Sequence, residues 1–240
     1  MFLYNDFLLL KNELLNKELV SVDLEDIRII KTSQELKFLQ KAADIADQAF
    51  IKLLNEIHVG VTEMELAAKL EYYMRELGSE KVSFETIVAS GNRSALPHGA
   101  ASDKIIENGD FITFDFGATY KGYHSDITRT VVAGKAAEWQ KEIYKIVQDA
   151  QNFGVKNAKI GMTGQELDAM VRKQIADKGF EKNFIHGLGH GVGLRIHELP
   201  NINKLGDVPL QKNMVFSVEP GIYLPGWGGI RIEDDVLITE

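Results

Sequence analysis

Four carboxylates stand at matching positions in two stretches of the sequence and could together bind metal. Each stretch runs from a polar turn into an apolar segment that ends in an acid, then through glycine into a second segment with its own acid. The four acids are Asp115, Asp126, Glu219 and Glu233. Alternate residues of a strand share a face, so we expect these acids on one side of a sheet. Enclosed carboxylates repel each other unless cations lie between them, so the pattern predicts a pair of divalent metal ions with oxygen ligands.

A glycine-rich run offers a fifth ligand, His190. Residues 186–194 read His-Gly-Leu-Gly-His-Gly-Val-Gly-Leu, and glycines at this density let the backbone approach closely and hold the imidazole at the centre of the site. The sequence contains no cysteine, so any metal must be held by histidine and carboxylate side chains. His98 and His197 each stand near a turn, where a lone histidine is more commonly a surface or core residue than a catalyst.

The strands that must position these ligands alternate between a polar and an apolar face. The polar positions are Thr113, Asp115, Asp126, Thr128, Thr130, Ser217, Glu219, Arg231, Glu233 and Asp235. The apolar positions are Phe114, Phe116, Phe216, Val218, Ile230 and Ile232. We expect each stretch to form a β-hairpin that turns back through Gly122 in the first case and Gly229 in the second.

A pair of helices precedes each hairpin. In the first pair, Ser33 is the expected N-cap of a long helix whose apolar positions are Leu36, Leu39, Ala43, Ala46, Phe50, Leu53 and Ile57. Thr62 and Glu65 form a capping box for the next helix, which Gly78 ends. In the second pair, a helix from about 139 to 158 precedes a helix that begins with a second capping box, Thr163 and Glu166, and that Gly179 ends.

These two halves match at a constant spacing. Gly60, Thr62, Glu65, Leu66, Ala68 and Gly78 recur as Gly161, Thr163, Glu166, Leu167, Ala169 and Gly179, each at an offset of 101 residues. The repeat predicts an α/β (α+β) domain of two pseudo-symmetric halves, each with two helices and a β-hairpin, around a curved antiparallel sheet.

Composition sets limits on function. The 240 residues are 45% hydrophobic and carry a net charge of −8, which favours a folded chain and argues against binding to nucleic acid or to an anionic membrane. No signal peptide and no continuous apolar run of transmembrane length is evident, so we expect a cytoplasmic protein.

Six motifs in order resemble the pita-bread metallopeptidases, within which the closest subgroup is the Xaa-Pro dipeptidases (prolidases) and Xaa-Pro aminopeptidases. The resemblance covers roughly residues 27–240. The motifs lie at 96–99, 114–117, 125–130, 186–198, 218–223 and 231–234. Membership would imply the pita-bread fold and a metal-dependent exopeptidase that cleaves the bond between an N-terminal residue and proline.

The resemblance also implies roles for individual residues. Asp115 would bind one metal, Asp126 and Glu233 would bridge both, and His190 with Glu219 would complete the second. Mn²⁺ or Co²⁺ is the expected pair, with Zn²⁺ or Fe²⁺ as alternatives. Glu219 would move protons, and His98 and His197 would bind substrate and stabilise the oxyanion or donate to the leaving nitrogen. His186, Tyr223 and Arg231 would bind substrate or orient the carboxylates.

The first residues depart from the prolidase pattern. Residues 1–32 read as a strand or short helix followed by an alternating apolar stretch over 18–30. Since prolidases carry a complete α/β domain before the catalytic one, residues 1–30 are expected to be a remnant of that domain or a linker, and 31–240 the catalytic domain. The complete N-terminal domain usually contributes to dimerisation, so a homodimer is expected where it is present.

Three alternatives remain open from the sequence. A methionine aminopeptidase would keep the same five ligands but would prefer peptides of the Met-Ala type. A creatinase-like enzyme is disfavoured because metal-free relatives lose several of these ligands. An inactive pita-bread scaffold that binds peptide or protein would also be expected to lose ligands, whereas an inactive fragment would keep the metal site and bind without turnover.

Overall fold

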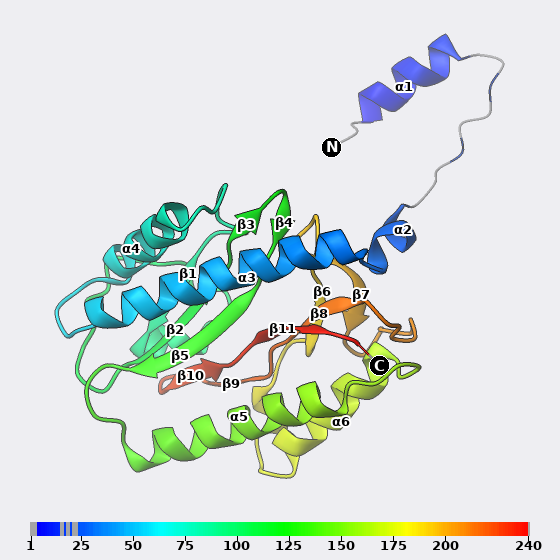
Figure 1. Ribbon diagram of the computed structural model, residues 1–240. Coiled ribbons are helices and arrows are strands. Elements are labelled where there is room, and N and C mark those ends of the chain that lie inside the picture. Colours follow the sequence, from blue (N-terminus) through cyan, green and yellow to red (C-terminus); the bar gives the residue numbers. More distant parts are fainter. Residues whose placement is uncertain (1–3, 15–16, 18–19, 21–23, 240) are drawn as a thin grey trace.

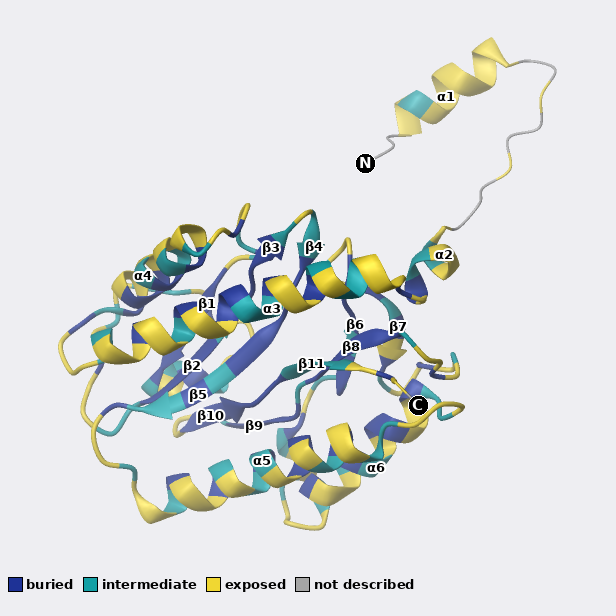
Figure 2. Ribbon diagram, in the orientation of Figure 1, coloured by how far each residue is buried: buried dark blue, intermediate teal, exposed yellow. Residues whose placement is uncertain are grey.

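Two layers of paired helices enclose the strands. The computed structural model describes residues 4–14, 17, 20 and 24–239. Figure 1 shows α3 (Ser33–Leu53) and α4 (Glu63–Glu76) on one side of the strands, and α5 (Glu138–Asn157) and α6 (Gly164–Ala176) on the other. In Figure 2 the buried residues of these helices follow one face of each, as the predicted periodicity requires.

The strands form two main antiparallel sheets, one in each half. The first has the order β1-β2-β5 and comprises β1 (Ile87–Ser90), β2 (Phe111–Phe116) and β5 (Ile127–Val132). The second has the order β11-β8-β6-β7 and comprises β6 (Gly189–Gly191), β7 (Glu198–Ile202), β8 (Val215–Val218) and β11 (Asp234–Leu237). Short 3₁₀ helices occur at η1 (Leu54–Glu56), η2 (Gly91–Ala95) and η3 (Glu181–Asn183).

The two expected hairpins are each interrupted by a smaller one. As expected, β2 pairs with β5 and β8 pairs with β11. The first connection contains a short hairpin of β3 (Thr119–Tyr120) and β4 (Tyr123–His124). The second contains a hairpin of β9 (Gly221–Leu224) and β10 (Gly228–Arg231). Gly122 makes the first turn with φ +80°, but the expectation for Gly229 is wrong, since Gly226 at φ +84° lies in the second turn. Gly229 lies within β10, where a Cβ would collide with the carbonyl oxygen of Ser94.

The halves meet where β5 runs beside residues 231–234. The Glu233 amide donates to the Thr128 carbonyl oxygen at 3.2 Å, and the Thr130 hydroxyl donates to the Arg231 carbonyl oxygen at 2.9 Å. The predicted apolar positions divide between two buried cores, with Phe114 and Phe116 in the first half and Phe216, Val218, Ile230 and Ile232 in the second. The polar face is therefore the surface where the two halves join.

The helix caps largely follow the sequence patterns. Thr62 and Thr163 cap their helices in the predicted capping boxes, and Gly78 and Gly179 adopt φ +105° and +88° just after the helices end. The exception is the first long helix, because Thr32 rather than Ser33 is its N-cap and shares a capping box with Glu35. A hydroxyl one residue earlier reaches the free amide of the first turn, which the periodicity alone does not specify.

The first residues contain helices. α1 (Tyr4–Glu13) has no buried residue and lies apart from the body of the chain in Figure 1. α2 (Glu25–Ile29) replaces the alternating pattern expected over 18–30 in the part that the structure describes, while residues 18, 19 and 21–23 of that stretch lie outside it. Within the described ranges, no helix combines the length and the apolar run needed to cross a bilayer. The division at residue 30 stays a prediction.

A buried acid on α4 fixes the loop that carries His98. The side chain of Glu63 is fully buried and accepts hydrogen bonds from the amide and hydroxyl of both Ser90 and Ser102. It also pairs with Arg93 Nε at 3.0 Å. The helix thereby ties both ends of the 90–102 segment to one carboxylate.

We expect Glu63→Gln to destabilise the fold by about 3 kcal/mol, because an amide nitrogen would face donors and Arg93 would lose its charged partner. Urea denaturation measures the change. Glu76→Gln is the matched control, since Glu76 pairs with Lys52 where both side chains are more than 40% exposed, and it should cost at most about 0.5 kcal/mol. Equal losses in the two variants would contradict this assignment.

Candidate metal centre

Three of the predicted acids converge where the two halves join. Asp115 lies near the end of β2, Asp126 between β4 and β5, and Glu233 between β10 and β11. One carboxylate oxygen from each lies within 4.8 Å of the others. Asp126 and Glu233 are almost completely buried, with 5% and 1% of their surfaces exposed. The junction thus brings together carboxylates whose mutual repulsion is little screened by water.

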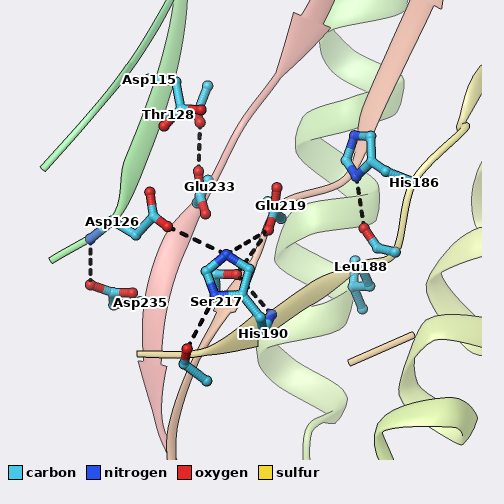
Figure 3. Close-up of polar contacts among 12 residues, drawn as sticks. Asp115, Asp126, Thr128, His186, Leu188, His190, Ser217, Glu219, Glu233 and Asp235 are labelled. Atoms are coloured by element: carbon cyan, nitrogen blue, oxygen red, sulfur yellow. Dashed lines mark hydrogen bonds and ion pairs between the residues drawn. The ribbon is translucent and has the colours of Figure 1, made fainter. Parts of the chain in front are cut away.

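His190 and Glu219 lie beside these three acids and complete the group, with His190 between Asp126 and Glu219 (Figure 3). His190 Nε2, from β6, lies 3.5 Å from Asp126 Oδ2 and 3.5 Å from Glu219 Oε1. The other ring nitrogen, Nδ1, lies 3.1 Å from the Gly191 carbonyl oxygen and must donate to it, since a carbonyl only accepts. In the neutral ring Nε2 therefore directs its lone pair at carboxylate oxygens, an arrangement that a cation between them satisfies.

Burial controls the protonation of these groups. It raises the pKa of Asp126 and of Glu233 well above their usual values, and neighbouring acids raise both further. Burial also raises the pKa of Glu219 to about 8. For His190, burial and the nearby His197 lower the pKa to about 4, so the imidazole is neutral at physiological pH and free to act as a ligand.

The donor set fits divalent cations. Asp115 Oδ1 is buried and has no hydrogen-bond partner, although Oδ2 of the same carboxylate is held by Arg231 Nη2 at 2.5 Å. Four carboxylates and one imidazole, two of them buried and three half-buried, form an oxygen-rich set of the kind that binds Mn²⁺, Co²⁺, Fe²⁺ or Zn²⁺. The structure brings these five side chains together, and their role as metal ligands stays a prediction.

Hydroxyl and amide groups orient the carboxylates. Thr128 Oγ1 donates to Glu233 Oε2 at 2.5 Å, and Ser217 Oγ donates to Glu219 Oε1 at 3.0 Å. Asp235 Oδ2 accepts the backbone amide of Asp126 at 2.9 Å and so fixes that residue from the other half of the molecule. Strand alternation placed Thr128, Ser217 and Asp235 on the polar face, but it carried no signal for these pairings.

A chain of hydrogen bonds connects Asp115 to His186. Arg231, which is 3% exposed, binds Asp115 and also donates through Nη1 to the Tyr223 hydroxyl at 2.9 Å. That hydroxyl donates in turn to His186 Nε2 at 2.8 Å, because His186 Nδ1 donates to the Gly187 carbonyl oxygen. Burial raises the pKa of Tyr223 to about 12 and lowers that of His186 to about 4, so both side chains are neutral.

The metal ligands face a cavity of about 620 Å³. His98 and His197 are exposed residues on its wall, and the His197 ring lies 4.2 Å from the His190 ring. His186 and Arg231 also line the cavity, whereas Tyr223 is behind Arg231 and is not among the lining residues. Sequence reasoning missed Glu25 and Phe84, which line the same cavity from segments without a recognisable motif.

A second buried acid holds the loop that carries His186. Asp168, on α6, pairs with Arg172 at 2.9 Å and accepts the Leu188 amide at 3.0 Å. Arg172 donates to the carbonyl oxygens of Phe184 and His186. The helix therefore fixes the backbone on both sides of His186, as Glu63 does for the His98 loop.

A duplicated α/β frame that joins its halves around buried carboxylates and one imidazole defines a metalloenzyme of the pita-bread class. The chain belongs to metallopeptidase family M24, which matches residues 37–240. Membership implies divalent metal ions, and the acidic cluster of Asp115, Asp126 and Glu233 could hold them.

Known relatives agree with this assignment. The chain is 53% identical to the Xaa-Pro dipeptidase of Pyrococcus furiosus over 226 residues, covering 93% of this chain and 65% of the relative's length. Among solved structures, an Xaa-Pro dipeptidase from Bacillus anthracis has a TM-score of 0.96 at 50% identity, covering 99% of this chain and 67% of that one. The X-Pro aminopeptidase from Thermotoga maritima has a TM-score of 0.95 at 46% identity, covering 99% and 68%. The chain thus spans about two thirds of these relatives, and the predicted pita-bread fold is confirmed.

The pKa shifts predict how the stability of the metal-free protein changes with pH. Between pH 6.5 and 8 an unfolded histidine is at most half protonated, whereas buried carboxyls such as Glu219, with a pKa near 8, keep most of their protons in the folded state, so the carboxyls dominate. Their raised pKa makes the folded state bind more protons than the unfolded state, so the free energy of unfolding should fall from pH 6.5 to 8. Urea denaturation with a chelator present measures this, and added Mn²⁺ should reverse the trend. A rise with pH in the chelated protein would contradict the assignment.

Proposed function

We propose that the chain is a dinuclear metal-dependent exopeptidase that hydrolyses the bond between an N-terminal residue and proline. The observation that carries this proposal is the five-residue donor set, which faces a cavity large enough for a short peptide. The 53% identity to a Xaa-Pro dipeptidase supports the choice of substrate. The similarity to an X-Pro aminopeptidase supports longer Xaa-Pro peptides as alternative substrates.

Asp115, Asp126, His190, Glu219 and Glu233 would hold the metal ions. Bound there, two divalent cations would supply a water of lowered pKa and polarise the scissile carbonyl. Mn²⁺ or Co²⁺ is the proposed pair, and Zn²⁺ or Fe²⁺ suits the same oxygen-rich donor set. The expected homodimer, formed with a complete N-terminal domain, and the cytoplasmic location are part of the same proposal.

The protein groups around the cavity perform the proton transfers. Glu219, whose Oε1 is held by Ser217, accepts a proton from the attacking water and returns it to the proline nitrogen as the C–N bond breaks. Burial lowers the pKa of His197, so its neutral ring can donate N–H to the developing oxyanion from the cavity wall. His98 lies on the same wall and is placed to bind substrate or donate to the leaving nitrogen. Arg231, Tyr223 and His186 keep Asp115 in position.

Substrate choice tests the proposal directly. The Mn²⁺-loaded chain should release free proline from Ala-Pro and Leu-Pro, should leave Met-Ala-Ser intact, and should stop when a chelator is added. Cleavage of Ala-Pro-Gly but not of the dipeptides would assign it as an Xaa-Pro aminopeptidase. Cleavage of Met-Ala-Ser alone would support a methionine aminopeptidase, and metal binding without any cleavage would support a scaffold.

Asp126→Ala should abolish turnover and remove one equivalent of bound metal, because Asp126 is the acid expected to bridge both ions. Amino-acid release assays and metal analysis of the purified variant measure the two effects. Asp149→Ala is the control, since Asp149 is an exposed aspartate on α5 that pairs only with Lys145 among the contacts the structure gives it. Full activity in the Asp126 variant would exclude the proposed site.

A further inference from the structure

A buried ion pair, Lys31 with Glu198, lies next to the turn that carries His197. Lys31 Nζ and Glu198 Oε1 are 2.8 Å apart, and only 1% and 2% of the two side chains are exposed. Buried pairs seldom add net stability over apolar side chains of similar size, so their position in a structure is the better guide to their role.

The lysine is rigidly held at the N-terminus of α3. Its backbone amide donates to the Asn213 carbonyl oxygen at 3.0 Å, and the next residue, Thr32, is the helix N-cap. Lys31 Nζ also lies 3.4 Å from the Ile29 carbonyl oxygen. The ammonium group is therefore a fixed point rather than the end of a mobile side chain.

The glutamate organises the turn that presents His197. Glu198 follows His197, begins β7, and accepts the Arg195 amide through Oε2 at 3.2 Å. A Cβ at Gly193 would collide with the same carboxylate, so the turn is wrapped closely around it. Arg195 in addition pairs with Glu25 of α2 at 2.7 Å. Residues 193–198 are thus held from the segment that precedes α3.

We propose that Lys31 is a positioning residue, which fixes Glu198 and thereby holds the His197 imidazole on the cavity wall beside His190. The inference rests on the proposed function for the role of His197, but the geometry of the turn can be measured without it. Loss of the ammonium should leave the metal ligands in place and should let residues 193–198 move. A misplaced transition-state contact lowers kcat more than it raises KM.

The test compares Lys31→Met with Lys52→Met in the full chain. Lys31→Met should lower kcat on the best Xaa-Pro substrate by about 10- to 100-fold, with KM changing much less. In the metal-free protein, hydrogen exchange at the Arg195 amide should become faster. Lys52 forms an exposed ion pair with Glu76 at the C-terminal ends of α3 and α4, so Lys52→Met should change neither quantity. Wild-type kcat and wild-type exchange in Lys31→Met would overturn the proposal.

A double variant separates positioning from simple stabilisation. Lys31→Met with Glu198→Gln leaves no unpaired buried charge, so it should fold even where Lys31→Met alone does not. We expect its melting temperature to recover while kcat stays low and exchange at Arg195 stays fast. Recovery of kcat together with stability would overturn a positioning role.

Failure of the proposed function would give a different result. If the unchanged chain binds Mn²⁺ but cleaves none of the peptides, the exopeptidase proposal fails. The exchange measurement still tests the role of Lys31. Faster exchange at the Arg195 amide in Lys31→Met supports Lys31 as a positioning residue, and unchanged exchange overturns it.

Discussion

The repulsion among buried carboxylates at one junction is the constraint on which the rest of this structure depends. Asp126 and Glu233 are almost fully buried within reach of Asp115, and their raised pKa values express the cost of placing them there. Hydrogen-bond donors lower that cost at Glu233, which accepts from the Thr128 hydroxyl, and at Asp115, which accepts from the Arg231 guanidinium. The repulsion that these donors leave uncompensated is what a divalent cation at the junction would relieve.

The duplicated frame supplies the acids symmetrically but the imidazole only once. Strands β1, β2 and β5 of the first half correspond to β6, β8 and β11 of the second. In the first half Ile87 lies opposite Asp115, and in the second half Leu188 lies opposite Glu219, whose amide donates to the Leu188 carbonyl oxygen. Ile87 and Leu188 are therefore equivalent positions. Two residues further along the same strands, Ala89 is equivalent to His190. The small side chain of Ala89 is buried, whereas His190 reaches the carboxylates. Divergence at one strand position therefore distinguishes the two sides of the centre.

The parts that the sequence predicts are those set by local patterns. Capping boxes at Thr62 and Thr163 and the polar strand face depend on residues a few positions apart, and the repeat is visible because both halves carry the same local patterns. The inserted hairpins, the displaced turn at Gly226 and the bond from the Asp126 amide to Asp235 depend on contacts between distant segments, which periodicity does not encode. Near the N-terminus, the apolar alternation over 18–30 does not specify a helix. The structure has α2 there, and this helix contacts β7.

The loops around the cavity show a common way of making flexible segments precise. His98, His186 and His197 all lie outside the sheet core, where backbone is ordinarily mobile. Each loop is joined to a helix or a helix N-terminus through a buried acid, namely Glu63, Asp168 and Glu198, each paired with a basic side chain. An acid can accept several backbone amides at once while a cation balances its charge, so one side chain fixes a whole turn. These three charge pairs thus hold the backbone around the cavity in place. The carboxylates at the junction cannot do this, because they repel one another.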